Sequence, residues 1–90
     1  MENKKITVSG RVQGVWFRGY TRKIASSLDI KGYVKNLPNG NVEILAMGNQ
    51  DKMDKFISKV KVGPPEARVE SIEIKEISES IDYENFQISY

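Results

Sequence analysis

Residues 10–20 read GRVQGVWFRGY, and within them the spacing of the apolar side chains changes. Between residues 6 and 12 apolar and polar residues alternate, which is the period of a strand with one face on a core. From Phe17 the apolar residues recur at helical spacing, to about Leu28. The chain is therefore predicted to leave a strand and begin a helix around Gly14, whose backbone freedom allows the turn.

The rest of the sequence predicts four more strands and one more helix. The strands are expected over residues 33–37, 42–46, 66–77 and 86–90. The helix follows Asn49, a favourable N-cap, and stops at Gly63-Pro64-Pro65. A turn at Pro38-Asn39-Gly40 joins the second and third strands as a hairpin. The alternation slips between Val69 and Ile72, where a bulge is expected.

This order of elements is β-α-β-β-α-β with an additional strand at the end, that of two split β-α-β units. It predicts an α+β fold, a ferredoxin-like α/β sandwich. Both helices would lie on one face of an antiparallel sheet of four strands, with a short C-terminal fifth strand. The length of 90 residues suits one core, so a single domain over residues 1–90 is expected. Because this architecture carries many unrelated functions, the function has to be inferred from a site.

The composition excludes several kinds of chemistry. The chain contains no cysteine and no histidine, which removes a disulfide framework, a thiolate nucleophile and most metal sites. The acidic residues are scattered rather than clustered, so neither a metal nor another cofactor is predicted. The net charge is only +2 and both signs are interspersed, which gives no reason to expect a nucleic-acid partner.

The location is inferred from what the sequence lacks. No stretch has the apolar length of a signal peptide or of a membrane helix. We therefore expect a cytoplasmic protein without a membrane partner, and a monomer is the default expectation.

The junction around Gly14 has the features of an anion site. The backbone N–H groups of residues 15–18 fall where the first donors of a helix have no internal partner, and the helix dipole favours an anion there. Arg18 is a cation at a helix end that prefers acidic residues, and its planar fork suits two phosphate oxygens at once. Together these features predict a site for one tetrahedral anion.

Each of these residues also has a structural interpretation. A glycine turn before a helix is common, and an arginine in a first helical turn usually meets a carboxylate or solvent. Phe17 is expected to be the first core residue of the helix, whereas Trp16 could form a hydrophobic lip beside the site. Taken alone, the glycine and the arginine favour the structural interpretation, and only the electrostatic misplacement of Arg18 favours the anion.

Two stretches carry a resemblance to a known family. Residues 8–18, VSGRVQGVWFR, resemble the first signature of the acylphosphatase family, whose GxVQGVxFR core forms a phosphate-binding loop. Residues 32–48, GYVKNLPNGNVEILAMG, resemble the second signature of this family in every fixed position. The resemblance covers essentially the whole chain, and two long motifs are far more specific than a lone glycine-rich loop.

The resemblance implies hydrolysis of the carboxyl-phosphate bond of small acyl phosphates, with a carboxylate and inorganic phosphate as products. It implies that Arg18 binds the substrate phosphate and that Asn36 positions the attacking water. The phosphate cradle would be formed by five consecutive residues, Gly14, Val15, Trp16, Phe17 and Arg18. Without the surrounding motif, Asn36 would instead be a strand-end residue bonded to its neighbouring turn.

This reaction fits a chain without histidine. The carboxylate leaving group is a weak base, with a pKa of about 4, and needs no protonating acid. The reaction mainly requires a positioned water and stabilised phosphoryl oxygens. The Asn36 amide can hold a water but cannot take its proton, so this residue would orient the water rather than act as a base. The sequence does not select one acyl phosphate as the substrate.

Four other functions are compatible with the fold. An RNA-binding domain would stack bases on aromatic residues of its central strands, but residues 6–12 and 42–47 contain none. A metal-carrying domain would need paired cysteines in its first loop. A non-catalytic anion sensor, or a domain attached to a larger carbamoyl-transferring protein, is an alternative with the same fold. The combination of Arg18 and Asn36 and the short length favour a small enzyme.

Overall fold

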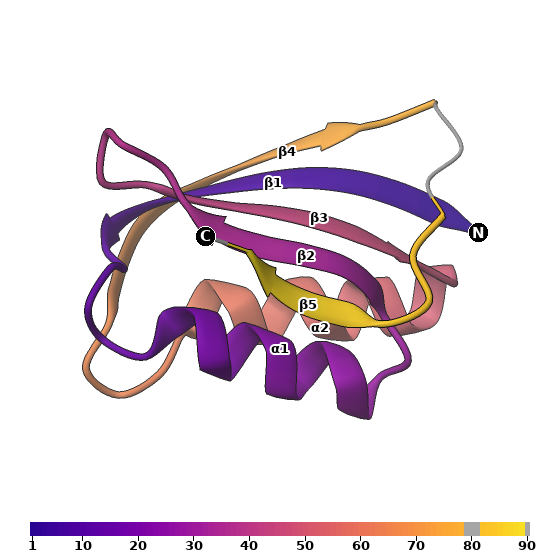
Figure 1. Ribbon diagram of the computed structural model, residues 1–90, viewed down its shortest axis with the longest axis horizontal. Coiled ribbons are helices and arrows are strands. Elements are labelled where there is room, and N and C mark those ends of the chain that lie inside the picture. The colour runs from indigo at the N-terminus through magenta and orange to yellow at the C-terminus, as the bar shows by residue number, and fades with distance from the viewer. Residues whose placement is uncertain (79–81, 90) are drawn as a thin grey trace.

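The computed structural model of the chain describes residues 1–78 and 82–89. Its elements are β1 (Glu2–Arg11), α1 (Phe17–Ser27), β2 (Lys31–Asn36), β3 (Val42–Gly48), α2 (Gln50–Val62), β4 (Arg68–Glu76) and β5 (Phe86–Ser89). The strands form one sheet in the order β4-β1-β3-β2-β5, and both helices cover the same face of it (Figure 1). The predicted α+β sandwich of the ferredoxin-like type is confirmed.

The first strand is longer than predicted. β1 begins at Glu2 rather than at residue 6, although its first residues are polar. They extend the strand because β1 lies between two partners: Glu2 pairs with Gly48 of β3, and Lys4 pairs with Glu76 of β4. The Lys4 ammonium lies 3.3 Å from Glu2 Oε1 and 3.8 Å from Glu76 Oε1. The alternation of apolar residues does not reveal strand residues that are held in the sheet by backbone pairing and by ion pairs.

The last strand lies at an edge of the sheet. β5 pairs with β2 in parallel, with Val34 opposite Ile88, whereas the other strand pairs are antiparallel. The Phe86 ring is buried and lies 6.0 Å, between centroids, from the ring of Phe56 in α2. Tyr90, which the alternation assigns to this strand, lies outside the described residues.

The predicted irregularity and the predicted hairpin are both found. The register of β1 and β4 shifts between Ser9 and Gly10, which pair with Ser71 and Val69, so Glu70 is the extra residue of the bulge. Between β2 and β3 the Leu37 N–H donates to the Asn41 carbonyl over 2.8 Å. This turn closes directly after the end of β2.

The second helix begins and ends as predicted. The Asn49 side-chain oxygen accepts a hydrogen bond of 3.0 Å from the Lys52 N–H, and Asp51 lies in the first turn. Lys59 and Lys61 lie in the last turn, and Gly63 follows as the C-cap. Both ends of α2 therefore carry the charges that the helix dipole favours.

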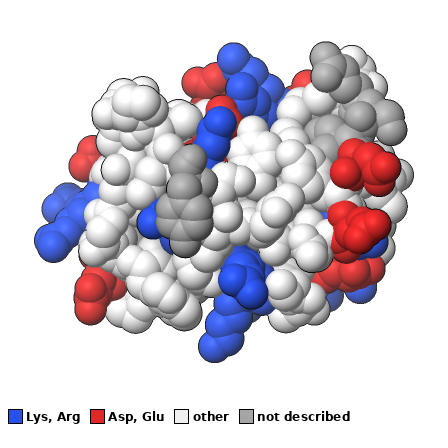
Figure 2. Space-filling view, viewed as in Figure 1, with Lys and Arg blue, Asp and Glu red and all other residues white. Residues whose placement is uncertain are grey.

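The core fills the space between the sheet and the helices. Its buried side chains come from every layer and include Ile6, Val8, Val34, Ile44, Phe17, Ile24, Met53, Phe56, Val60 and Phe86. Neither described helix combines the length and the apolar character needed to cross a bilayer. On the face shown in Figure 2, basic and acidic side chains are interspersed around uncharged surface.

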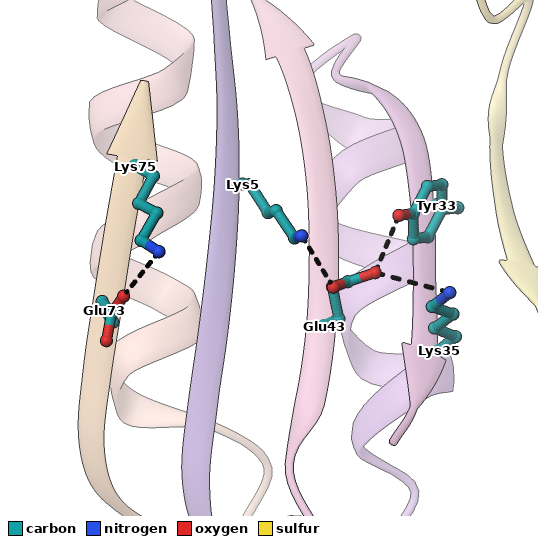
Figure 3. Close-up of polar contacts among 6 residues, drawn as sticks. All are labelled: Lys5, Tyr33, Lys35, Glu43, Glu73 and Lys75. Atoms are coloured by element: carbon teal, nitrogen blue, oxygen red, sulfur yellow. Dashed lines mark hydrogen bonds and ion pairs between the residues drawn. The ribbon is translucent and has the colours of Figure 1, made fainter. Parts of the chain in front are cut away.

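The open face of the sheet holds one nearly buried carboxylate. Glu43 is only 8% exposed, and its Oε2 accepts a 2.8 Å hydrogen bond from the Tyr33 hydroxyl. The ammonium groups of Lys5 and Lys35 lie 3.3 Å and 3.5 Å from its two oxygens (Figure 3). Burial by itself would raise the pKa of Glu43, but these hydrogen bonds and positive charges outweigh it and lower the pKa. Burial and the Glu43 carboxylate raise the pKa of Tyr33.

We expect Glu43→Gln to lower the free energy of unfolding at neutral pH by about 1 to 3 kcal/mol, because it removes the charge that three partners share. The folded pKa of Glu43 lies below its ordinary value. Its contribution is therefore fully present above the ordinary value and is lost as the pH falls through the folded pKa. Urea denaturation of both proteins from neutral to acidic pH measures this shrinking difference.

The matched control for this substitution is Glu73→Gln. Glu73 pairs with Lys75 over 3.4 Å on the exposed surface of β4, and Figure 3 shows this pair beside the Glu43 cluster. Its loss should change the free energy of unfolding by less than about 0.5 kcal/mol. A Glu43→Gln effect that stays constant into acid would contradict the assignment.

Candidate active site

The first helix begins without the features that stabilise the second. Its N-cap is Trp16, in the left-handed region at φ 64°, and no side chain caps the first amides. No acidic residue lies in the first turn of α1, which contains Arg18 instead. The leading N–H groups of α1 thus have no intrahelical acceptor, and the positive end of the helix dipole is not compensated by a side-chain carboxylate. This end of the helix is suited to an external anion.

The loop before α1 is anchored to the core by every second side chain. Val15 and Phe17 are buried, at 5% and 1% exposed, whereas Trp16 between them is 62% exposed. Phe17 is therefore the core residue that the sequence predicts. Gly14 has φ 75°, and a Cβ added to it would meet no atom within 4 Å. Its positive φ, and not crowding, is the reason for glycine at this position.

A pocket of about 210 Å³ opens at this junction. Most of the residues singled out by sequence line it, namely Gly14, Trp16, Phe17, Arg18 and Asn36. Val15 does not line the pocket, because its side chain belongs to the core. Sequence reasoning missed three other lining residues, Val12, Gly19 and Ile88. Ile88 gives no local signal, since it reaches the pocket only through the pairing of β5 with β2.

Arg18 reaches the pocket from the first turn of α1. Its side chain is partly buried, and one guanidinium nitrogen, Nη1, lies 3.5 Å from the Ser89 carbonyl of β5. A contact of this length is a weak hydrogen bond. The guanidinium can exchange it for the shorter, charge-assisted bonds that a phosphate group offers.

Asn36 is the last residue of β2 and borders the same pocket. Its side-chain oxygen Oδ1 is buried and accepts no hydrogen bond from any described residue. An unpaired buried acceptor costs about 1 to 3 kcal/mol, so its presence beside a pocket makes Asn36 a candidate site residue. The Asn36 side chain does not form a hydrogen bond with the adjacent turn. Asn39 Oδ1 accepts there instead, from the Asn41 N–H over 3.0 Å.

Gln13 joins the loop to the hairpin that follows Asn36. Its side-chain amide nitrogen donates to the Leu37 and Asn41 carbonyls, each over 2.8 Å. The contact spans 24 and 28 residues of sequence, so no local pattern could predict it. Gln13 thereby fixes the end of β2, and with it Asn36, relative to the loop that bears Arg18.

Trp16 packs on Gly19. A Cβ added to Gly19 would collide with the indole Nε1 of Trp16. The indole therefore lies directly against the first turn of α1 and forms one edge of the pocket. Glycine at position 19 is required for this arrangement.

The comparison with known proteins agrees with this geometry. The acylphosphatase family model matches residues 4–88. The chain belongs to the acylphosphatase family. An acylphosphatase of Archaeoglobus fulgidus is 54% identical over 96% of both chains. The crystal structure of the Bacillus subtilis acylphosphatase covers 100% of both chains with a TM-score of 0.96 and 38% identity.

The same fold occurs inside a larger protein. The crystal structure of T. kodakarensis HypF matches 100% of this chain but only 12% of its own, with a TM-score of 0.87 and 35% identity. The acylphosphatases of Archaeoglobus fulgidus and Thermotoga petrophila instead match over 96% and 99% of their own length. Family membership confirms the predicted function class: the chain is a hydrolase of acyl phosphates.

We expect Gln13→Ala to lower kcat by about 10- to 100-fold, because Asn36 loses the tether that holds its strand end near the loop. KM should change much less, since the loop and Arg18 remain in place. The free energy of unfolding should fall by about 1 to 2 kcal/mol. Steady-state kinetics with benzoyl phosphate and urea denaturation measure these effects.

The control is Gln50→Ala, which removes an exposed glutamine from the first turn of α2. It should leave kcat unchanged. If Gln13→Ala raised KM and left kcat at the parent value, the positioning role of Gln13 would be wrong.

Proposed function

We propose that the acyl phosphate binds in the pocket between the loop of residues 14–18 and the end of β2. The backbone cradle for the phosphate is formed by Gly14, Val15, Trp16, Phe17 and Arg18. The Arg18 guanidinium binds two of the phosphate oxygens. The single observation that supports this proposal most is the uncapped start of α1, with Arg18 where a carboxylate is normally found. Val15 contributes through its backbone alone, since its side chain is buried in the core.

Asn36 orients the attacking water in this proposal. A water that donates to the unpaired Asn36 Oδ1 satisfies the buried acceptor and keeps its lone pairs free for phosphorus. The water oxygen bonds to phosphorus, and the bond from phosphorus to the acyl oxygen breaks. The carboxylate leaves with the electron pair. The proton of the water passes to a phosphate oxygen of the substrate, because Asn36 cannot accept it.

Arg18 and the cradle stabilise the charge that moves during this step. Negative charge on the phosphoryl oxygens is met by donors that are already in position, so little reorganisation is needed at the transition state. The carboxylate is stable as an anion and needs no acid to protonate it. These two conditions explain how a chain without histidine or cysteine can perform the hydrolysis.

The proposal extends to the protein as a unit. We infer a single domain over residues 1–90 that acts as a cytoplasmic monomer on a small acyl phosphate and releases inorganic phosphate. Nucleic-acid binding is not part of the proposal, since the open face has an ion-paired Glu43 where an RNA-binding sheet needs exposed aromatic stacking. The alternative of a non-catalytic anion sensor predicts phosphate binding without turnover.

Arg18→Ala should lower kcat/KM for benzoyl phosphate by at least about 1000-fold, because the main cationic partner of the phosphoryl oxygens is lost. Inorganic phosphate should also inhibit this variant far more weakly. Phosphate release in the presence of a chelator measures the activity. No metal ion has a role in the proposed reaction, so the chelator should not lower the activity of the parent protein.

The matched control for Arg18→Ala is Lys55→Ala. Lys55 is an exposed cation on α2, and its removal changes the net charge by the same amount without touching the pocket. Its kinetics should equal those of the parent. Near-normal turnover by a folded Arg18→Ala protein would refute the phosphate-binding assignment.

Asn36→Ala should lower kcat by about 100- to 1000-fold while the inhibition constant of inorganic phosphate changes by less than about threefold. The reason is that water placement matters to the reaction and not to phosphate binding in the ground state. Equal losses in turnover and in phosphate affinity would show that Asn36 contacts the phosphate instead.

A further inference from the structure

A second hollow adjoins the phosphate pocket along α1. It has a volume of about 470 Å³ and is lined by Trp16, Gly19, Arg22, Lys23, Ser26 and Ile88. Trp16, Gly19 and Ile88 also line the phosphate pocket, so the two spaces meet at these residues. A phosphate held by Arg18 leaves its acyl group outside the cradle. This neighbouring hollow shares three residues with the phosphate pocket and offers a space on α1 into which the acyl group can extend.

The hollow is basic. Arg22 and Lys23 are both exposed, and neither forms an ion pair with a residue in the described ranges 1–78 and 82–89. α1 itself, from Phe17 to Ser27, contains no acidic residue. Figure 2 shows a group of basic side chains over the middle of α1, surrounded on this face by uncharged atoms. The charges of Arg22 and Lys23 are therefore available to a ligand.

The arrangement contrasts with that of the other helix. α2 has Asp51 in its first turn and its last-turn cations at Lys59 and Lys61, as the helix dipole favours. In α1 the cations lie in the N-terminal two-thirds, and no basic residue lies in the last turn. Arg18, in the first turn, is thus placed against the dipole, whereas Arg22 and Lys23 lie in the middle of the helix, where neither end of the dipole stabilises them.

The spacing along α1 matches a short acyl group. Arg18 and Arg22 are four residues apart in the helix, so they share a face and are separated by about 6 Å along the axis. A chain of a few carbon atoms, or one aromatic ring, spans this distance. Trp16 and Ile88 line both spaces, so their apolar surfaces can contact such a spacer.

We propose that Arg22 and Lys23 form a subsite for a second anionic group, and that the preferred substrates are acyl phosphates whose acyl part ends in a carboxylate or a phosphate. The proposal rests on the proposed function, because it takes the phosphate end of the substrate to be bound at Arg18. The apolar middle of the substrate lies against Trp16 and Ile88, and its distal anion lies near Arg22 and Lys23. This subsite distinguishes between acyl phosphates that present the same reacting group.

The test compares substrates of matched shape. Benzoyl phosphate reports the reaction itself, 4-carboxybenzoyl phosphate adds the distal anion, and 4-carbamoylbenzoyl phosphate adds a neutral group of the same size. The parent protein should show a kcat/KM for the carboxylate about fivefold to tenfold above that for the amide. This ratio should fall as salt is added, because the subsite is exposed. A 4-phosphonobenzoyl phosphate probe shows whether a phosphate-like anion gains as much as the carboxylate.

The double variant Arg22→Gln/Lys23→Gln should bring the carboxylate-to-amide ratio close to one. The control, Lys55→Gln/Lys61→Gln, removes two exposed cations from α2 and should keep the parent ratio. A parent ratio near one, a ratio that survives the double variant, or an equal fall in the control would each overturn the proposal.

Binding without turnover separates this proposal from the reaction. The non-hydrolysable pair 4-carboxybenzylphosphonate and 4-carbamoylbenzylphosphonate should differ about fivefold or more in affinity by calorimetry. Equal affinities would overturn the subsite even in an active enzyme. If the parent protein released no phosphate from benzoyl phosphate, the failure would lie with the proposed function, and the phosphonate pair would still decide whether the subsite exists.

Discussion

The start of α1 lacks any side chain that caps its first amides, and the rest of the site depends on this. In an ordinary helix, as in α2, an Asn or Asp side chain would occupy the position of the anion. Here Trp16 stands at the N-cap and Arg18 in the first turn, so the helix end is left for a ligand. The buried Val15 and Phe17 supply the anchorage that the missing cap does not. The loop can therefore remain ordered while its polar backbone atoms stay available for the proposed phosphate cradle.

The topology of the sheet brings the remaining parts to this helix end. β2 lies between β3 and β5, so the end of β2 supplies Asn36 while β5 supplies Ile88. Gln13 then bonds the loop to the turn beyond Asn36. Three segments far apart in sequence are thus held together by backbone pairing and one amide side chain. The site uses the rigidity of the sheet where a looser arrangement would need extra ordering on substrate binding.

Features that depend on local periodicity could be predicted from the sequence. The helix caps of α2, the hairpin after Asn36 and the bulge near Val69 each leave a mark within a few residues. The start of β1 could not be predicted, because its first residues are polar and lack the apolar alternation of a strand. They belong to β1 through their pairing with β3 and β4. In the site, Arg18 carried its own electrostatic signal, whereas Asn36 was identified by the resemblance. Gln13 and Ile88 act through contacts made by distant segments, which a single sequence does not show.

The position of Trp16 has a consequence for spectroscopy. It is the one tryptophan of the chain, and it lies largely exposed against Gly19 at the edge of the pocket rather than in the core. Its fluorescence therefore reports the environment of the loop, and a bound acyl group would change that environment directly. Trp16 is thus an intrinsic optical probe for occupancy of the proposed site. For the same reason, loss of its native signal under denaturant records local opening of the loop, which can precede the unfolding of the core.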